Sequence, residues 1–497
     1  MVAAHPRLIA FLMGAMAALG FAPMNLWPLM LIGLAVLMHL VRSAPGWRAA
    51  AGRGWFWGWG HFMVNSNWIA HAFTYQDAMP HWLGWAAVAG LGAFLAVYVG
   101  AVGVGSWWAR ARALPFTLIF ASAWVFAEYA RAELFTGYAW DPVGVVFEPT
   151  WLREMSPFTG TYGVSGVAIV LSCLILASGR PWHFGGLALA GALLWLGGLY
   201  LPTTKSASEM SYPHIVIIQP NIPEEIGNDP NNDSAILAKQ MALVPPPNRQ
   251  HPRLIIWPEG ATIRYLDTDV GLRRLLASHL GPHDLLALGG PKLEVDAQGH
   301  FTGARNSIYV INAAGDIVAR YDKAHLVPGG EYLPLRPLMS AIGLARLVPG
   351  DIDDIPGPGP RTFTLPDFGK AGFIICYEAI FSGEVTDRAT RPDFIINPSD
   401  DAWFGSWGPP QHLAQAQMRA LEEGIPIIRA TTTGISAVID AQGHLKYTQP
   451  LHTQGVIEAD IPPATAPTLF SRYGNAIPLT FAALLLISGI ALARRTR

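Results

Sequence analysis

Residues 372–381, "GFIICYEAIF", form an apolar run that leads into a cysteine, a tyrosine and a glutamate. A short β-branched run that starts at a glycine predicts a buried strand, so Cys376 is expected at a strand end. Seven similar runs are "HIVIIQ" (214–219), "RLIIWPE" (253–259), "LLALGG" (285–290), "SIYVIN" (307–312), "DFIINPS" (393–399), "IPIIRAT" (425–431) and "ISAVID" (435–440). Amphipathic segments 271–280 and 411–424 predict helices between them. Buried strands that alternate with helices predict a layered α/β domain.

The composition of the 497-residue chain indicates a protein that lies largely in a membrane. Hydrophobic residues make up 51% and charged residues only 14%, whereas soluble domains carry about 25% charged residues. A membrane helix needs about 20 apolar residues. We therefore expect a bundle of seven membrane helices over 1–201, an exterior domain over 211–466 and a last membrane helix over 476–493. The eight apolar segments are 8–23, 24–41, 54–74, 82–108, 114–131, 161–178, 184–201 and 476–493.

The charged residues of the loops predict the orientation of these helices. Cytoplasmic loops collect Lys and Arg, and segments 41–53, 109–112, 179–182 and 493–497 are basic, whereas 75–82 has neither residue. Both termini are therefore expected in the cytoplasm, and segment 202–475 outside it. The net charge of −2 provides no basic surface for phosphates, which argues against nucleic acid as a partner.

Three polar segments at the ends of apolar runs carry side chains that suit a nucleophilic mechanism. They are "LIIWPEG" with Glu259, "YDKAHLVPGGEYLP" with Lys323 and Glu331, and "GFIICYEAIF" with Cys376. Open α/β sheets bind ligands beyond their strand ends, so these side chains are expected to converge. Glu259 would then take the thiol proton, and Lys323 would stabilise the thiolate and an oxyanion.

Each of these residues also has a simpler structural interpretation. Cys376 can be a small core residue, and Glu259 and Lys323 can be solvated surface charges. Spacing alone does not decide between these alternatives. Other residues have comparable interpretations. His325 and His412 are expected to form local hydrogen bonds rather than to bind a metal, Asp400 and Asp401 to lie in a turn, and Glu128 and Arg131 to lie at the membrane interface. Cys173 is expected to be a packing residue, and Trp403 and Phe404 either pack or line a substrate entrance.

The motifs taken together resemble those of one enzyme superfamily. "WPEG", "DKAHLVPGGEYLP" and "CYEAIF", in this order and spacing, resemble the Glu–Lys–Cys signatures of the nitrilase, or carbon–nitrogen hydrolase, superfamily. The whole chain, with "IIQPNIP" (217–223), "SDDAWFG" (399–405) and its apolar segments, resembles the apolipoprotein N-acyltransferase family. The resemblance implies an αββα sandwich for the exterior domain. The sequence predicts neither a cofactor nor a metal.

The resemblance also implies roles for single residues. Glu259 matches the general base of the family, Lys323 its oxyanion-stabilising lysine, and Cys376 its acylated nucleophile. Glu331, Tyr377 and Glu378 match residues that support the lysine or follow the nucleophile. The chain departs from the family pattern at three positions, which leaves the substrate contacts open: Pro220 in place of a Gly, Asn228 near an expected Trp, and Asp400 in place of an Asn.

The implied reaction is a two-step acyl transfer at the bacterial inner membrane, with the catalytic domain in the periplasm. A phospholipid would acylate Cys376, and the N-terminal amine of a diacylglyceryl-apolipoprotein would then accept the acyl chain. One alternative is a membrane-anchored, nitrilase-type amidase that passes the acyl group to water. A second alternative is a transporter or receptor whose exterior domain only binds a ligand, in which case Cys376→Ser would leave function intact.

Overall fold

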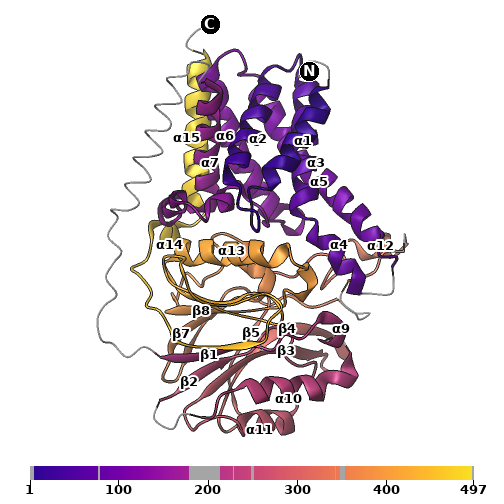
Figure 1. Cartoon of the computed structure of the whole chain (residues 1–497), viewed down its shortest axis with the longest axis vertical. Coiled ribbons are helices and arrows are strands. Elements are labelled where there is room, and N and C mark those ends of the chain that lie inside the picture. The colour runs from indigo at the N-terminus through magenta and orange to yellow at the C-terminus, as the bar shows by residue number, and fades with distance from the viewer. Residues whose placement is uncertain are drawn as a thin grey trace. The chain divides into compact units, whose positions relative to one another are not determined.

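The computed structural model describes residues 5–75, 79–177, 213–227, 229–247, 251–341, 343–347 and 353–494 (Figure 1). Within these residues the chain forms two compact units. The helical unit covers 1–67, 85–210 and 469–497, and the sheet unit covers 68–84 and 211–468. Three predicted features lie outside the described residues: the membrane segment 184–201, the basic segment 179–182 and Asn228.

The helical unit consists of apolar helices that pack side by side (Figure 1). Glycine allows the backbones of the first and third helices to touch, because a Cβ atom at Gly14 would lie 1.9 Å from the carbonyl oxygen of Trp57. The helices are α1 (Pro6–Ala18), α2 (Trp27–Arg42), α3 (Trp47–Asn65), α5 (Leu83–Trp107), α6 (Ala113–Glu133), α7 (Ser156–Ala177), α14 (Leu469–Tyr473) and α15 (Ala476–Arg494), with the short η2 (Leu134–Thr136), η3 (Val143–Phe147) and η4 (Trp151–Met155).

Three stretches of the described chain are long and apolar enough to cross a membrane: Leu83–Trp107, Ala113–Thr136 and Ala476–Arg494. The apolar helices α1 and α2 are shorter. The prediction of a single helix over 54–74 is wrong, because α3 ends at Asn65. The amide of Asn67 donates to the carbonyl oxygen of Val64 at 2.9 Å, and such local side-chain bonds compete with helix continuation. The full set of eight membrane helices stays a prediction.

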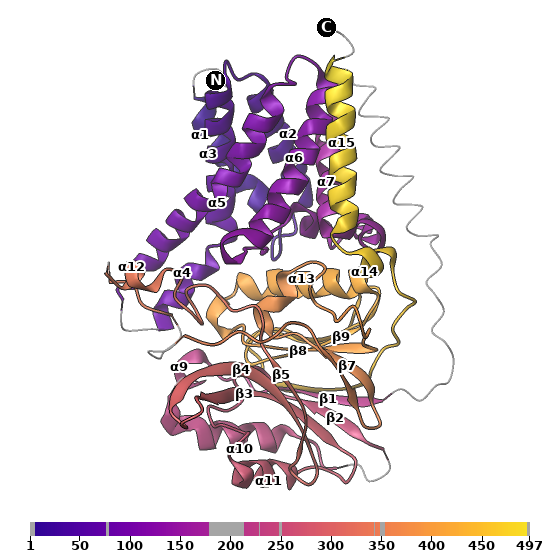
Figure 2. The same cartoon turned by 180° about the vertical axis from the view of Figure 1, so that it is seen from behind.

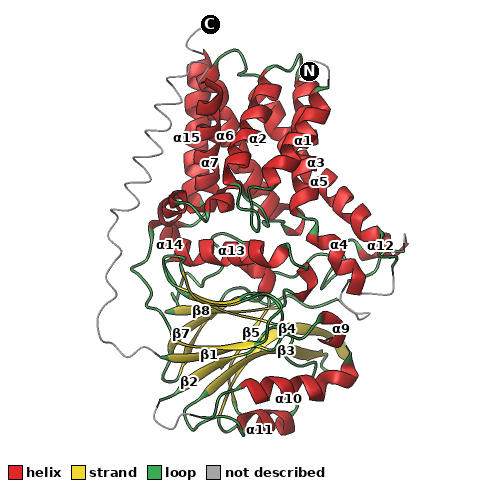
Figure 3. Cartoon of the chain, in the orientation of Figure 1, coloured by secondary structure: helices red, strands yellow, loops and turns green. Residues whose placement is uncertain are grey.

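The sheet unit contains two six-stranded sheets that lie face to face (Figure 3). The first has the order β12-β1-β2-β3-β4-β5 and the second β11-β10-β9-β8-β7-β6. In each sheet three neighbouring strands are parallel, namely β1, β2 and β3 in the first and β7, β8 and β9 in the second. The strands are β1 (His214–Gln219), β2 (Arg253–Ile256), β3 (Leu285–Val295), β4 (Phe301–Asn312), β5 (Ile317–Asp322), β6 (Thr362–Leu365), β7 (Gly369–Phe373), β8 (Phe394–Ser399), β9 (Ile427–Thr431), β10 (Ser436–Ile439), β11 (Leu445–Gln449) and β12 (Gly455–Asp460).

Helices cover the outer face of each sheet, which completes four layers (Figure 2). Helices α10 (Asp233–Leu243) and α11 (Val270–Ala277) share a core with the first sheet that includes Leu237, Leu272 and Trp257. Helix α13 (Gly408–Glu423) shares a core with the second sheet through Leu413 and Ala416. The predicted layered α/β domain is therefore confirmed. The remaining short helices are α4 (Trp68–Ala72), η1 (Phe73–Tyr75), α9 (Glu224–Gly227), η5 (Pro230–Asn232), α12 (Arg336–Ala341), η6 (Cys376–Ile380) and η7 (Ala402–Phe404).

Candidate active site

The three predicted segments meet at strand ends in the sheet unit. Glu259 follows β2, Lys323 directly follows β5, and Cys376 follows β7 at the first residue of η6. All three side chains are buried, with exposed fractions of 8% for Glu259, 1% for Lys323 and 4% for Cys376. Two of these strands belong to the first sheet and one to the second. The fold thus brings together side chains that are far apart in the sequence.

Lys323 lies between two carboxylates. Its Nζ is 3.2 Å from Oε1 of Glu259 and 2.8 Å from Oε1 of Glu331. Burial by itself lowers the pKa of Lys323, but the charges of Glu259 and Glu331 outweigh burial and hold that pKa well above its usual value. Lys323 is therefore a permanent cation at this position. Glu331 lies where the resemblance implied, beside the lysine.

The sequence analysis missed Asn306, which joins the two carboxylates. Its Nδ2 donates to Oε1 of Glu259 at 2.6 Å and to Oε1 of Glu331 at 2.9 Å. The backbone carbonyl oxygen of Asn306 accepts from the backbone N–H of Lys323 at 2.8 Å. In the sequence, Asn306 is marked only as a polar residue directly before the apolar run 307–312, and such a position is too common to identify a site residue. Asn306 therefore helps to hold Glu259, Lys323 and Glu331 in one arrangement.

Glu378 connects the turn that carries Cys376 to the loop that carries Lys323. Its Oε2 accepts at 2.7 Å from the backbone N–H of Ile375, the residue directly before Cys376. Its Oε1 accepts from the N–H of Ala324 at 2.8 Å and from the hydroxyl of Tyr321 at 2.7 Å. The side chain is buried, and its hydrogen bonds hold the loop of Ala324 and the turn of Ile375 together.

The thiol of Cys376 is protonated at rest. Burial raises the pKa of this thiol well above its usual value, and the negative charge of Glu259 raises it further, while Lys323 opposes these effects. The raised pKa therefore favours the neutral thiol over the thiolate at neutral pH. For the sulfur to act as a nucleophile this proton would have to leave, which requires a base close by.

The other predicted site residues lie nearby but contact different partners. Tyr377 is buried and packs its ring edge-on against Phe381, with ring centroids 5.4 Å apart. Phe404 is buried, with its ring centroid 4.6 Å from that of Trp68. Trp403 is half-buried, and its ring centroid lies 5.7 Å from that of Tyr75. These contacts are packing contacts, and substrate binding by Trp403 and Phe404 stays a prediction.

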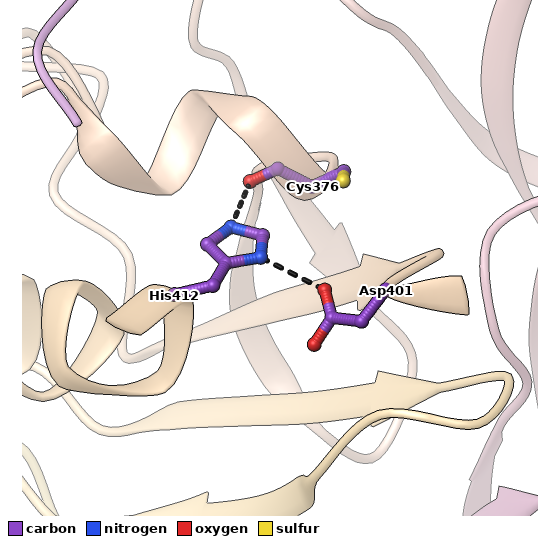
Figure 4. Close-up of side chains that lie close together, drawn as sticks. All are labelled: Cys376, Asp401 and His412. Atoms are coloured by element: carbon purple, nitrogen blue, oxygen red, sulfur yellow. Dashed lines mark hydrogen bonds and ion pairs between the residues drawn. The ribbon is translucent and has the colours of Figure 1, made fainter. Parts of the chain in front are cut away.

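Asp400 and Asp401 do more than terminate a turn. The backbone N–H of Asp400 donates to Oε2 of Glu259 at 2.8 Å. Both carboxylate oxygens of Asp401 accept from Arg429, at 2.8 and 2.7 Å. Asp401 also lies 2.9 Å from Nδ1 of His412, whose Nε2 lies 2.9 Å from the carbonyl oxygen of Cys376 (Figure 4).

Cys376, Asp401 and His412 are close enough together to be compared with a metal site (Figure 4). Their possible ligand atoms lie within 4.8 Å of one another. Both Asp401 and the ring of His412 are already hydrogen-bonded, and the guanidinium of Arg429 places a positive charge beside them. A second cation would be repelled there, so the cluster is better described as a hydrogen-bonded network.

Glu128 and Arg131 are buried inside the helical unit, and their interpretation as residues at the membrane interface stays a prediction. Arg131 forms an ion pair with Asp141. Glu128 accepts from the ring N–H of Trp124 at 2.8 Å and from the backbone N–H of Val143 at 2.7 Å. Both side chains line a cavity of about 20 Å³. These contacts have no signal in the sequence, because Asp141, the partner of Arg131, follows the helix in a loop that periodicity does not describe.

Comparisons with known proteins agree with this arrangement. A family model described as the apolipoprotein N-acyltransferase N-terminal domain matches residues 13–174, and one described as carbon-nitrogen hydrolase matches residues 216–468. The apolipoprotein N-acyltransferase of Rhodopseudomonas palustris is 34% identical, over 94% of this chain and 91% of its own length. That of Bradyrhizobium diazoefficiens is also 34% identical, over 99% of this chain and 95% of its own length.

Two solved structures resemble the chain more distantly. An amidase from Nesterenkonia sp. has 16% identity and a TM-score of 0.34, and covers 52% of this chain and 94% of its own. Saccharomyces cerevisiae Nit3, described as a member of branch 10 of the nitrilase superfamily, has 19% identity and a TM-score of 0.36, and covers 55% of this chain and 98% of its own.

The sheet unit is thus a nitrilase-like domain of the carbon–nitrogen hydrolase class, because the matched residues 216–468 contain every group of the site. The helical unit narrows this class further, since it has a matching family model of its own. The chain belongs to the apolipoprotein N-acyltransferase family, whose members align with it through both units. It is an acyltransferase, and its apolar helices make it a membrane-associated one.

Proposed function

We propose that this protein transfers a fatty acyl chain from a membrane phospholipid to the N-terminal amine of a diacylglyceryl-apolipoprotein. The observation that carries this proposal is the position of Lys323, buried between Glu259 and Glu331 and within electrostatic reach of Cys376. A fixed cation beside a nucleophile and a base suits a reaction that passes through an oxyanion. The names of the full-length relatives support the choice of substrates.

In the first step, Cys376 attacks the ester carbonyl of the phospholipid while Glu259 takes the thiol proton. The new bond joins Sγ to the carbonyl carbon, and the carbonyl electron pair moves to the oxygen, where Lys323 stabilises the charge. The ester C–O bond then breaks, and Glu259 returns the proton to the departing oxygen. The products are a lysophospholipid and a thioester on Cys376. Glu331 keeps Lys323 in place through the 2.8 Å ion pair.

In the second step, the neutral amine of the acceptor attacks the thioester. Glu259 takes a proton from the nitrogen, and Lys323 stabilises the second oxyanion. The C–S bond breaks, the sulfur recovers the proton from Glu259, and the product is an amide. The enzyme returns to the protonated thiol that its buried setting favours.

The proposed topology follows the basic loops. Eight membrane helices, in a bundle over 1–201 and a last helix over 476–493, place both termini in the cytoplasm and the catalytic domain 211–466 in the periplasm. A membrane-impermeant thiol reagent tests this in intact cells whose outer membrane is permeabilised. Exposed Ser278, replaced as Ser278→Cys, should be labelled, whereas exposed Ser43, replaced as Ser43→Cys in a basic loop, should be protected. The reverse pattern would refute the orientation.

Intact-mass analysis tests the reaction itself. The purified protein is mixed with phospholipid, and an added acyl mass that hydroxylamine removes is expected, with Cys376→Ala as the variant that stays unmodified. Addition of a diacylglyceryl peptide should then remove the mass and yield an acylated peptide. Release of free fatty acid in place of that peptide would identify a hydrolase. Absence of any adduct on active protein would contradict the thioester mechanism.

A further inference from the structure

A fully buried histidine contacts the backbone of the proposed nucleophile. His412 lies on α13, and its Nε2 is 2.9 Å from the carbonyl oxygen of Cys376 (Figure 4). A carbonyl oxygen only accepts hydrogen bonds, so Nε2 has to carry a hydrogen whatever the charge of the ring. His412 is therefore a donor to the residue that carries the sulfur.

The other ring nitrogen is held by a buried charged pair. Nδ1 of His412 lies 2.9 Å from Oδ1 of Asp401 and 3.0 Å from a guanidinium nitrogen of Arg429, which also pairs with Asp401. Burial and the positive charge of Arg429 lower the pKa of His412, and the negative charge of Asp401 opposes them. Arg429 further donates to Asn397 at 2.6 Å, so the network is anchored on β8. The buried partners of Nδ1 therefore hold the ring in place, and Nε2 donates to Cys376 whether the ring is neutral or protonated.

Cys376 needs such support because its backbone is unusual. Its φ of +46° lies in the left-handed region, which residues other than glycine rarely adopt and keep only where their surroundings enforce it. Neighbouring residues are tied by side chains, since Asn397 donates to the carbonyl oxygen of Ile374 at 3.1 Å and Glu378 accepts from the N–H of Ile375. The tie to Cys376 itself comes from His412.

We propose that His412 is a positioning residue for acyl transfer: it fixes the Cys376–Tyr377 peptide and so the direction in which the sulfur is presented. A trans peptide is planar, so a held carbonyl fixes the orientation of the whole group, including the Cα that bears the thiol. Figure 4 shows the carbonyl oxygen of Cys376 facing the ring and the sulfur at the other end of the residue. This inference rests on the proposed function, in which Cys376 is the nucleophile.

The test compares two amide substitutions in a Cys173→Ala background, which leaves Cys376 as the one cysteine of the sequence. The amide nitrogen of Gln is as many bonds from Cα as Nε2 of His, whereas that of Asn matches Nδ1. His412→Gln should therefore keep the bond and His412→Asn should lose it. We expect acylation by phospholipid to slow about 10- to 100-fold in His412→Asn, because displacements near 1 Å cost up to about 100-fold, and to stay within about threefold in His412→Gln. The loss should fall on kcat rather than on KM.

Gln417→Leu provides the matched control. Gln417 is buried on the same helix and donates to the carbonyl oxygen of Gly443 at 3.0 Å, away from the site. It should lose stability without a change in the acylation rate of the folded fraction. Equal acylation rates in His412→Gln and His412→Asn would overturn the proposal, as would an equal loss in Gln417→Leu.

A second readout does not depend on acyl transfer. The rate at which iodoacetamide alkylates Cys376 is measured against pH in the same variants, and the pH midpoint is expected to shift in His412→Asn but not in His412→Gln or Gln417→Leu. If the unsubstituted protein takes up no acyl chain, the proposed function fails, and the alkylation profiles still decide whether His412 positions the sulfur. Identical profiles in all variants would count against that role.

Discussion

The carboxylate of Glu378 accepts a hydrogen bond from the backbone N–H of Ala324 at 2.8 Å, which ties the residue after Lys323 to the turn of the proposed nucleophile, Cys376. The same side chain accepts from the N–H of Ile375 at 2.7 Å. One buried group therefore sets the spacing between Lys323 and Cys376. This relationship gives a structural reason for the glutamate two residues after the cysteine.

Glu378→Gln should disturb this spacing. The carboxylate accepts from donors on both oxygens, and an amide places an N–H against one of them. We expect a loss of about 1–3 kcal/mol in stability, since a buried donor is left without an acceptor, together with slower acylation. Thermal unfolding and the intact-mass assay measure these effects. Glu458→Gln, in an exposed ion pair on β12, should change neither.

Lys323→Met should remove the cation from between Glu259 and Glu331. Acylation should fall about 100- to 1000-fold, the range seen when one group that stabilises an oxyanion is lost. The rate of appearance of the acyl adduct measures this. Lys292→Met is the matched control, because Lys292 also pairs with a glutamate, Glu294, on the same sheet. Normal acylation in Lys323→Met would show that the lysine does not stabilise the oxyanion.

Glu259→Gln should separate thiol acidity from catalysis. The negative charge of Glu259 raises the pKa of the Cys376 thiol, so a neutral amide at this position should lower that pKa. Alkylation of Cys376 by iodoacetamide should therefore reach its midpoint at a lower pH. Acylation should nevertheless slow by about 100-fold or more, because the proposed base is removed. Faster acylation in this variant would indicate a resting thiolate mechanism instead.

Asp400→Asn should stabilise the protein at neutral pH. Burial raises the pKa of Asp400 to about 6, so the folded chain holds this proton more tightly than the unfolded chain does. Ionisation then destabilises the fold as the pH rises from about 4 to about 6. The substitution should add about 1–3 kcal/mol at pH values near 7.5 and little near pH 4. Thermal unfolding at both pH values measures this difference.

Asp353→Asn should change the stability at neutral pH in the opposite direction to Asp400→Asn. Arg336 donates to the carboxylate of Asp353 and lowers its pKa, so the ionised form stabilises the fold above the unfolded pKa. Loss of that charge should destabilise the protein at neutral pH, and the effect should fade as the pH falls through the folded pKa. If both variants shift stability in the same direction at neutral pH, the assignment of these two carboxyl groups is wrong.

Much of the sheet unit could be predicted because its signals are local. The runs at 214–219 and 307–312 became β1 and the end of β4, since consecutive apolar, β-branched residues suit strands buried on both faces. The exposed strand β11 was missed because its residues form no apolar run. The helix boundary at Asn65 was missed because hydropathy continues past it while the chain turns into the sheet unit.

By itself, the sequence determined the α/β class, the membrane association and the identity of Glu259, Lys323 and Cys376 as candidates, because strand patterns, apolar length and motif order can be read along the chain. Only the tertiary structure decided how these groups are paired. The bridge made by Asn306, the donor His412 and the protonated state of the thiol all depend on distances across strands and on burial. Electrostatic interactions and hydrogen bonds act through space, so residues far apart in sequence set the charge of each other's side chains.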